Sequence, residues 1–235
     1  MPDTTVTLIT GANRGIGREL AAQLADRGHT VVVAARTAEA ARSAAAELVE
    51  AGSARSIVPL ALNVTDPESI RAAAETVESD LGRVDVLINN AAIHFDAWQS
   101  AVDANLDIVG EALNTNLIGT WRVTQSFLPL LRKGHSARIV NVSSEQASLA
   151  RMGAGVPAYR TSKVALNGLT RMLAAELADA DITVDAASPG WTATDMGGEG
   201  GRPIADGAES IRRVIELPAG TGTGRFFQDG AELPW

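Results

Sequence analysis

Cysteine is absent from the 235-residue sequence, which excludes disulfide scaffolds, thiolate metal sites and cysteine nucleophiles. Histidine is scarce as well: His29, His94 and His135 are scattered along the chain, and we expect no metal site. The lack of cysteine fits a reducing compartment, so we expect a cytoplasmic location.

Positive charge is also in short supply. Lysine and arginine number 20 against 28 aspartate and glutamate residues, a formal net charge of −8. This balance argues against a broad basic surface for nucleic acid or anionic lipid, so an anionic ligand must be bound at a local site. No apolar run reaches the roughly 18 residues of a membrane helix, and the N-terminus has no basic region followed by an apolar one. We therefore expect neither a nucleic-acid nor a membrane partner.

Short apolar runs alternate with longer segments of helical period. The helical segments include one in which Ile16, Leu20 and Leu24 recur before Gly28, one from Asp66-Pro67 to Gly82, and one over 159–178. The segment 103–133 is long enough for one bent helix or two. The predicted strands, the first six apolar on both faces, are 6–10, 31–35, 57–62, 84–88, 138–142, 182–186 and 225–228.

This alternation predicts an α/β fold, a single-domain doubly wound parallel sheet with helices on both faces. We expect one domain over 1–235, because no internal repeat or linker divides the chain. The only shift in composition is at 197–207, which holds five glycines and Pro203. A surface loop and a mobile loop over a substrate site are the two interpretations of this segment.

A glycine-rich loop directly follows the first predicted strand and begins the first predicted helix. Glycines there allow a tight turn, let the backbone approach a pyrophosphate, and aim helix N-terminal amide groups at its negative charge. The spacing Gly-x-x-x-Gly-x-Gly alone does not distinguish such a loop from an ordinary strand-to-helix turn. The sequence of the loop is Thr10-Gly11-Ala12-Asn13-Arg14-Gly15-Ile16-Gly17.

Arg36 stands at the end of the second predicted strand, about 20 residues beyond the glycine loop. An acidic residue at this place would bind the ribose hydroxyls of NAD. An arginine instead pairs with the 2′-phosphate of NADP, and Arg14 can assist it. The sequence therefore favours NADP(H) over NAD; the alternative is that both arginines are merely solvated.

Tyr159 and Lys163 are four residues apart in a predicted helix and so lie on one face of it. Tyr159 is the only tyrosine in the chain. To exchange a proton near neutral pH, a tyrosine needs its phenolate stabilised by about 3 to 5 kcal/mol, which a nearby ammonium and a nicotinamide cation would supply together. Taken alone, this spacing is more often a half-buried helix face than an active site.

Six motifs occur in order at or near the predicted strand ends, where open α/β sheets bind ligands. They are Thr10-Gly11-x-x-x-Gly15-x-Gly17, Asn89-Asn90-Ala91-Ala92, Asn116, Ser143-Ser144, Tyr159-x-x-x-Lys163, and Pro189-Gly190 followed by Thr194. With these motifs the sequence resembles the short-chain dehydrogenase/reductase family over nearly the whole chain. The loop 197–207 and the ending Phe226-Phe227-Gln228-Asp229-Gly230 are most similar to its carbonyl reductase-like branch.

The resemblance implies a Rossmann fold and reduction of a carbonyl group with hydride from NADPH. In that reaction Tyr159 is the general acid, and Lys163 lowers the pKa of Tyr159 and binds the nicotinamide ribose. Ser144 holds the substrate oxygen, with Ser143 as a second hydrogen-bonding group. Asn116 positions a water that links Lys163 to solvent. The protein supplies orientation and electrostatics.

The resemblance also implies a set of cofactor contacts, with three departures from the family pattern. Ala92 stands where the family usually has glycine, and Asn63 where it has an aspartate that contacts the adenine amino group; the Asn63 side-chain oxygen can still accept that bond. The interval from Ser144 to Tyr159 is slightly long and enlarges the substrate side. The implied cofactor-binding residues are Gly11, Asn13, Arg14, Gly15, Ile16, Gly17, Arg36, Asn63, Val64, Asn90, Ala91, Tyr159, Lys163, Pro189, Gly190, Thr192 and Thr194.

The predicted substrate pocket is mostly apolar. It holds no basic residue to bind a carboxylate or phosphate, so it suits a hydrophobic ketone, aldehyde or quinone. Phe95, Gln146 and Trp191 are the predicted substrate contacts. The full predicted lining is Ile93, His94, Phe95, Gln146, Leu149, Met152, Trp191 and Met196.

Two other functions compete with a carbonyl reductase. A catalytically silent NADP-binding sensor or regulatory protein would keep the fold, but it would not need the complete set of Asn116, Ser144, Tyr159 and Lys163. A sugar-nucleotide epimerase or dehydratase would have a different glycine spacing and a larger C-terminal region. The family often pairs the helices in 103–133 and 159–178 across a two-fold axis, so we expect a homodimer or homotetramer.

Overall fold

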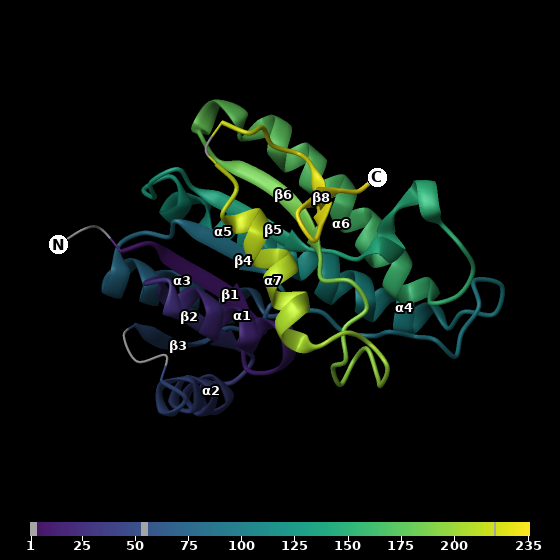
Figure 1. Cartoon of the computed structure of the whole chain (residues 1–235), viewed down its shortest axis with the longest axis horizontal. Helices are drawn as coiled ribbons and strands as arrows, with labels where there is room; N and C mark the ends of the chain where they lie inside the picture. Colours follow the sequence, from purple (N-terminus) through teal and green to yellow (C-terminus); the bar gives the residue numbers. More distant parts are fainter. Residues whose placement is uncertain (1–3, 53–55, 219) are drawn as a thin grey trace.

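A single twisted sheet forms the centre of the chain in the computed structural model, which describes residues 4–52, 56–218 and 220–235 (Figure 1). Its strands are β1 Val6–Thr10, β2 Thr30–Ala35, β3 Ile57–Ala61, β4 Val86–Asn89, β5 Arg138–Val142, β6 Thr183–Ser188, β7 Phe226–Gln228 and β8 Ala231–Glu232. They lie in the order β3-β2-β1-β4-β5-β6-β7-β8. All neighbouring strands of this sheet pair in parallel except β7 and β8, which are antiparallel.

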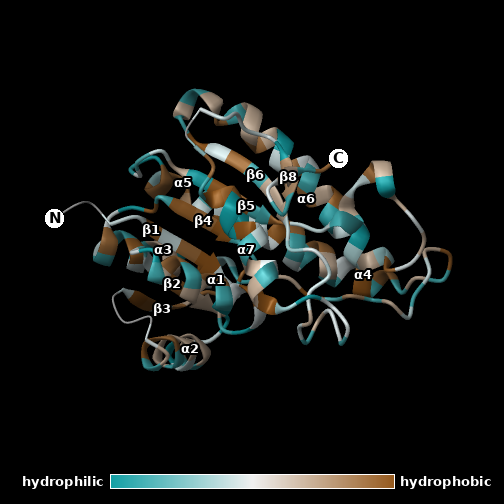
Figure 2. Cartoon of the chain, in the orientation of Figure 1, coloured by the Kyte–Doolittle hydropathy of each residue, from teal (hydrophilic) through white to brown (hydrophobic). Residues whose placement is uncertain are grey.

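Helices cover both faces of the sheet, and their bounds are α1 Gly15–Asp26, α2 Ala38–Glu50, α3 Pro67–Leu81, α4 Leu106–Leu113, α5 Thr120–Leu131, α6 Pro157–Glu176 and α7 Ile204–Ile215. Helices α1, α2 and α7 bury Leu20, Leu48 and Ile211 against one face. Helices α3, α5 and α6 bury Val77, Phe127 and Leu166 against the other. Burial on both faces explains the continuous apolar runs of the central strands, which are brown in Figure 2.

The predicted strands are confirmed to within two residues, and so are the signals at the ends of α3. Asp66 accepts a hydrogen bond from the N–H of Glu68, Pro67 occupies the first helical position, and Gly82 ends the helix in the left-handed conformation. The strand β3 differs from its prediction, because it is an edge strand rather than one apolar on both faces. Pro59 and Ala61 are exposed, and an edge is where a sheet tolerates proline.

The segment 103–133 forms one helical run rather than two helices, from Leu106 to Leu131. A π-helical stretch, Asn114–Gly119, joins α4 to α5 and contains Asn116. Helix α7 begins at Ile204, so the last four residues of the predicted loop 197–207 are helical and the loop itself ends at Pro203.

The order of the strands fixes where a ligand can bind. From β1 the chain adds β2 and β3 on one side of the sheet and then returns to place β4 on the other side of β1. In a doubly wound sheet this reversal leaves a crevice at the carboxyl ends of the strands. The arrangement is the single-domain Rossmann fold expected from the sequence. Among the described residues, no helix has the length and apolar character needed to cross a membrane.

Candidate active site

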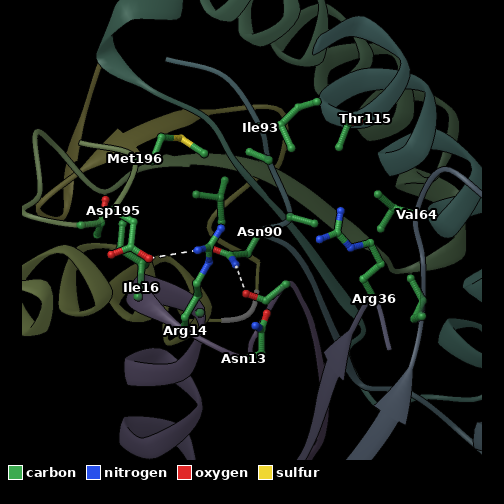
Figure 3. A pocket seen from close by; sticks show the side chains of 18 of the residues that line it. Asn13, Arg14, Ile16, Arg36, Val64, Asn90, Ile93, Thr115, Asp195 and Met196 are labelled. Carbon is green, nitrogen blue, oxygen red and sulfur yellow. Dashed lines mark hydrogen bonds and ion pairs between the residues drawn. The ribbon is translucent and has the colours of Figure 1, made fainter. Parts of the chain in front are cut away.

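A cleft of about 580 Å³ opens at the carboxyl ends of the strands, a volume typical of ligand sites (Figure 3). It is lined by segments that follow β1, β2, β3, β4, β5 and β6. Most of the predicted cofactor-binding residues line it: Gly11, Asn13, Arg14, Gly15, Ile16, Gly17, Arg36, Asn63, Val64, Asn90, Ala91, Tyr159, Lys163, Pro189 and Thr194.

The glycine loop makes the tight turn predicted from its sequence. Gly11 and Gly15 have φ of 63° and 53°, the left-handed region that favours glycine. Arg14 is the N-cap of α1 and makes no side-chain capping bond, and the first turn of α1 contains no acidic residue. The amide groups at this helix N-terminus therefore face the cleft without an anionic side chain of their own turn.

Asn90 joins the end of β4 to the glycine loop. Its Nδ2 donates to the carbonyl oxygens of Thr10 at 2.9 Å and Gly11 at 3.1 Å, and its N–H donates to Thr10 Oγ1 at 3.0 Å. Gly17 fits beneath this contact, because a Cβ added there would lie 2.5 Å from Asn90 Nδ2 and 2.7 Å from the Gly11 oxygen. The third glycine of the motif is thus required by a close approach rather than by a positive φ.

The two candidate phosphate-binding arginines have different surroundings. Arg36 follows β2, is exposed, and makes no ion pair with any residue that the structure describes. Arg14 pairs with Asp195 at 3.0 Å, and both side chains are largely exposed. Figure 3 shows Arg14 and Asp195 joined across the cleft from Arg36. Arg36 is therefore available to an anion as it stands, whereas Arg14 already has a carboxylate partner.

Asn63 does not offer its side-chain oxygen in the way predicted. Asn63 Oδ1 accepts bonds from the N–H of Thr65 at 3.2 Å and from Thr65 Oγ1 at 2.9 Å. Both lone pairs of this oxygen are used in the turn after β3. The predicted bond from an adenine amino group to this oxygen would have to displace Thr65, while Val64 beside it still lines the cleft.

Only some of the predicted cofactor-binding residues after β6 line the cleft. Pro189 and Thr194 line the cleft, whereas Gly190 and Thr192 do not. Thr192 is 4% exposed, and its hydroxyl donates to the carbonyl oxygens of Pro189 and Gly190. The Thr192 side chain thus stabilises the turn from inside.

Tyr159 and Lys163 lie one turn apart on α6, as their spacing predicts. Lys163 is 2% exposed, its Nζ lies 5.8 Å from the centre of the Tyr159 ring, and it donates to the carbonyl oxygen of Val142 at 2.7 Å. Burial lowers the pKa of Lys163 from 10.5 to about 8. A buried cation therefore stands beside the tyrosine at the inner end of the cleft.

Within the protein alone, burial raises the pKa of Tyr159, and a hydrogen bond with the Ser144 side chain opposes that rise. The Lys163 ammonium is directed to the Val142 oxygen rather than to the phenol, and desolvation is the larger of the two effects on the Tyr159 pKa.

The structure separates the two candidate serines. Ser144 contacts the Tyr159 hydroxyl and accepts a bond from the N–H of Gln146 at 3.2 Å. Ser143 is 1% exposed, and its hydroxyl donates to Asn167 Oδ1 at 2.6 Å, which ties its proton to α6 although the residue lines the cleft. This division agrees with the choice of Ser144.

Asn116 is fully buried in the π-helical stretch. Its Oδ1 accepts from the N–H of Ile93 at 2.8 Å, and its Nδ2 donates to the Ile93 oxygen and to Ser162 Oγ, each at 3.0 Å. Through these bonds the Asn116 side chain holds the segment after β4 against α6.

The predicted substrate residues gather only in part around Tyr159. Phe95 meets the Tyr159 ring edge to face at 5.3 Å between centroids, and Ile93 and Met196 line the cleft. His94 is paired with Glu111 at 2.9 Å.

The remaining predicted substrate residues are more open. Trp191 is exposed and its indole N–H donates to the Gly197 oxygen at 2.9 Å, while Gln146 is half-buried. Leu149 and Met152 are exposed, so this side of the site is an open apolar surface rather than an enclosed pocket.

Several residues of the site were missed in the sequence. Thr37, Thr115 and Asp195 line the cleft, and the buried Asp96 bonds to the backbone of Tyr159. Thr37 had a local signal, since it precedes a helical segment and caps α2 through the N–H of Ala40. Asp96 had none, because it lies 63 positions before Tyr159.

Comparisons with known proteins agree with this geometry. The family model described as short chain dehydrogenase matches residues 5–203. A 3-oxoacyl-[acyl-carrier-protein] reductase of Vibrio harveyi is 36% identical over 191 residues, which cover 81% of this chain and 75% of that protein.

Two solved structures share the fold over almost their whole length. The NADPH-bound carbonyl reductase from chicken fatty liver has a TM-score of 0.87 at 30% identity, with 99% of each chain covered. A 3-ketoacyl-(acyl-carrier-protein) reductase from Brucella melitensis complexed with NADH has a TM-score of 0.82 at 27% identity, covering 94% of this chain and 95% of that one. The chain belongs to the short-chain dehydrogenase/reductase family of oxidoreductases, whose members bind a nicotinamide cofactor.

Proposed function

We propose that this chain is an NADPH-dependent reductase that converts a hydrophobic ketone, aldehyde or quinone to the alcohol. The observation that carries the proposal is the arrangement of the cleft. Arg36 stands at one end without an ion-pair partner among the described residues, and Tyr159, in contact with Ser144 and beside Lys163, stands at the other. A site for a 2′-phosphate and a site for a proton donor thus share one cavity.

The cleft fits a dinucleotide on two grounds. The backbone at Gly17 approaches Asn90 and Gly11 so closely that no Cβ has room, which leaves a flat glycine surface and an open helix N-terminus for a pyrophosphate. An arginine after β2 favours a 2′-phosphate over free ribose hydroxyls. The two similar structures hold NADPH and NADH, respectively, so the preference for NADPH rests on Arg36.

In the mechanism, the bound NADPH supplies the hydride. Tyr159 donates a proton to the carbonyl oxygen, and Ser144 holds that oxygen beside it. The raised pKa keeps Tyr159 protonated at neutral pH, which is the form that a proton donor needs. Lys163 keeps positive charge next to the phenolate that forms, and its pKa of about 8 leaves it largely protonated at neutral pH.

The substrate side supports an apolar ligand. Phe95 packs on Tyr159, and Ile93 and Met196 line the adjoining wall. The proposal includes a mobile segment, Gly197 to Pro203, that closes over the substrate. Gly198 and Gly200 have φ of 70° and 90°, and the exposed Trp191 lies against Gly200.

The proposal also includes assembly as a homodimer or homotetramer in the cytoplasm. Leu106, Trp121 and Met172 are large apolar side chains exposed on α4, α5 and α6, the helices expected to pair. The absence of cysteine from the sequence supports a reducing compartment. Light scattering after size-exclusion chromatography measures the assembly, and a monomer at micromolar concentration would contradict it.

The activity is tested by NADPH oxidation with a panel of aldehydes, ketones and quinones. Tyr159→Phe should abolish turnover while NADPH still quenches tryptophan fluorescence. Arg36→Asp should raise the KM for NADPH far more than the KM for NADH. Arg42→Asp is the matched control, because Arg42 is exposed on α2 and outside the cleft. Survival of activity in Tyr159→Phe overturns the mechanism, and NADPH binding without turnover of any substrate would favour a silent NADP-binding sensor.

A further inference from the structure

The helix that carries Tyr159 begins without a capping side chain of its own. Val156, its N-cap residue, is 7% exposed and has φ of 45°, a strained conformation for a β-branched residue. Pro157 follows and has no N–H. The first N–H groups that need a partner therefore belong to Ala158 and Tyr159, and the first backbone bond back to the N-cap comes from Arg160 to the Val156 oxygen.

Asp96 supplies the missing cap from another part of the chain. Its Oδ2 accepts from the N–H of Ala158 at 2.9 Å, and its Oδ1 accepts from the N–H of Tyr159 at 3.0 Å. Gln99 Nε2 also donates to Oδ2 at 3.1 Å. Asp96 is fully buried, and its negative charge lies at the positive end of the α6 dipole. Its carboxylate makes no ion pair within the described ranges, so these three N–H donors compensate the charge.

The same segment is fixed at a second point. Three residues before Asp96, Ile93 is held through both its N–H and its oxygen by Asn116. Between them, Phe95 packs its ring on the Tyr159 ring. The strand end after β4 therefore connects the π-helical stretch to the first turn of α6, and the backbone and the ring of Tyr159 are both placed by it.

We propose that Asp96 is a positioning residue for the proton donor, fixing the first turn of α6 so that the Tyr159 hydroxyl meets Ser144. This inference rests on the proposed function, because it assigns Tyr159 that role. Asp96 itself lies behind the helix turn and touches no reacting atom. Its effect should therefore appear in kcat and not in the binding of NADPH.

Asp85 offers a matched control on the opposite edge of the sheet. It is 4% exposed, and its two oxygens accept from the N–H groups of Val6 at 2.7 Å and His135 at 2.9 Å. It precedes β4, whereas the active site follows that strand. Replacing Asp85 removes two backbone N–H bonds of the kind that Asp96 accepts, together with its ion pair to Arg83 at 3.2 Å, so it is the more severe loss, at a place that carries no residue of the cleft.

The experiment compares Asp96→Asn and Asp96→Ala with Asp85→Asn and Asp85→Ala in the full chain. We expect kcat to fall about tenfold to a hundredfold in Asp96→Ala, since misplacing a catalytic group by about 1 Å has effects of this size. The kcat of Asp96→Asn should fall less, because its side-chain amide oxygen can still accept a backbone N–H bond. The Kd of NADPH should stay within about threefold, because the glycine loop and Arg36 lie outside this turn. The Asp85 variants should keep kcat within about twofold, because Asp85 lies outside the cleft.

Two results would overturn the inference: Asp96→Ala keeping its kcat, or folded Asp85 variants losing kcat to the same extent. A second readout does not need activity. In Asp96→Ala the amides of Ala158 and Tyr159 should exchange hydrogen faster, with no change in the amides of α3. Unchanged protection at these two amides would refute the cap itself. If instead no carbonyl is reduced, or Tyr159→Phe stays active, the proposed function fails, and the exchange data still decide whether Asp96 holds this turn.

Discussion

Burial of the Lys163 charge should make the stability of this protein depend on pH in a way that one substitution removes. The ammonium is 2% exposed, and its pKa falls from 10.5 to about 8 through desolvation. Lys163→Met replaces it with an unbranched side chain that carries no charge. The pH dependence of the difference between the two proteins then reports on Lys163 alone, because their other groups are the same.

The sign follows from which state holds the proton. Between pH about 8 and 10.5 the folded chain has released the Lys163 proton while the unfolded chain keeps it, so the unfolding free energy of the wild type rises with pH. Below pH about 8 both states are protonated and the full cost of burying the charge is present. At about 1.36 kcal/mol per pH unit, that cost is about 3 kcal/mol, of which about 2 kcal/mol is relieved between about pH 7 and pH 9.5.

Urea unfolding at these two pH values measures the effect. The unfolding free energy of the wild type should rise by about 2 kcal/mol relative to that of Lys163→Met. Lys133→Met is the matched control, because Lys133 is the only other lysine in the sequence and is an exposed partner of Glu78. The unfolding free energy of Lys133→Met should change with pH as that of the wild type does. A difference between wild type and Lys163→Met that does not change with pH would show that Lys163 titrates as an ordinary lysine and would refute the reasoning.

Two further substitutions test single contacts of the site. Ser144→Ala should raise the pKa of Tyr159 further, because it removes the hydrogen bond that opposes the effect of burial; near-ultraviolet absorbance of the sole tyrosine measures it, and an unchanged value would mean that the bond is not made. Gly17→Ala should lower thermal stability by about 1 to 3 kcal/mol and weaken NADPH binding, because its Cβ would overlap Asn90 and Gly11, whereas Gly110→Ala, with no atom within 4 Å of its Cβ, should stabilise α4 by up to about 1 kcal/mol. Equal effects of the two alanines would contradict this.

The parts of the fold that could be predicted from the sequence depend on local signals. The strands β1 and β5 are rich in β-branched residues and buried over their whole length, and the ends of α3 carry an aspartate cap, a proline and a glycine stop. The glycine loop and the Tyr159–Lys163 spacing are local in the same sense. Because these signals follow strand ends, the topology alone brings them to one edge of the sheet.

The parts that could not be predicted are contacts between distant segments. Nothing near Ser143 in the sequence shows that its hydroxyl is bound to Asn167, and nothing near Asn116 shows that its amide is taken up by Ile93. Each pairing depends on how a strand end meets a helix that lies more than 20 residues away in the chain. A residue type at a motif position therefore predicts which group is present, but not whether its polar atoms are free to meet a ligand.

The pKa of Tyr159 likewise depends on surroundings that its local sequence does not show. Spacing alone predicts that Lys163 stabilises the phenolate, since it places a cation one turn away. Desolvation depends on the whole fold, and it acts on both groups: it raises the pKa of Tyr159 and lowers that of Lys163. Burial therefore moves the two pKa values apart, with that of Tyr159 above that of Lys163, and holds a neutral phenol beside a cation at neutral pH. The proposed carbonyl reduction needs that state before hydride transfer, because the proton must still be on the tyrosine when negative charge develops on the substrate oxygen.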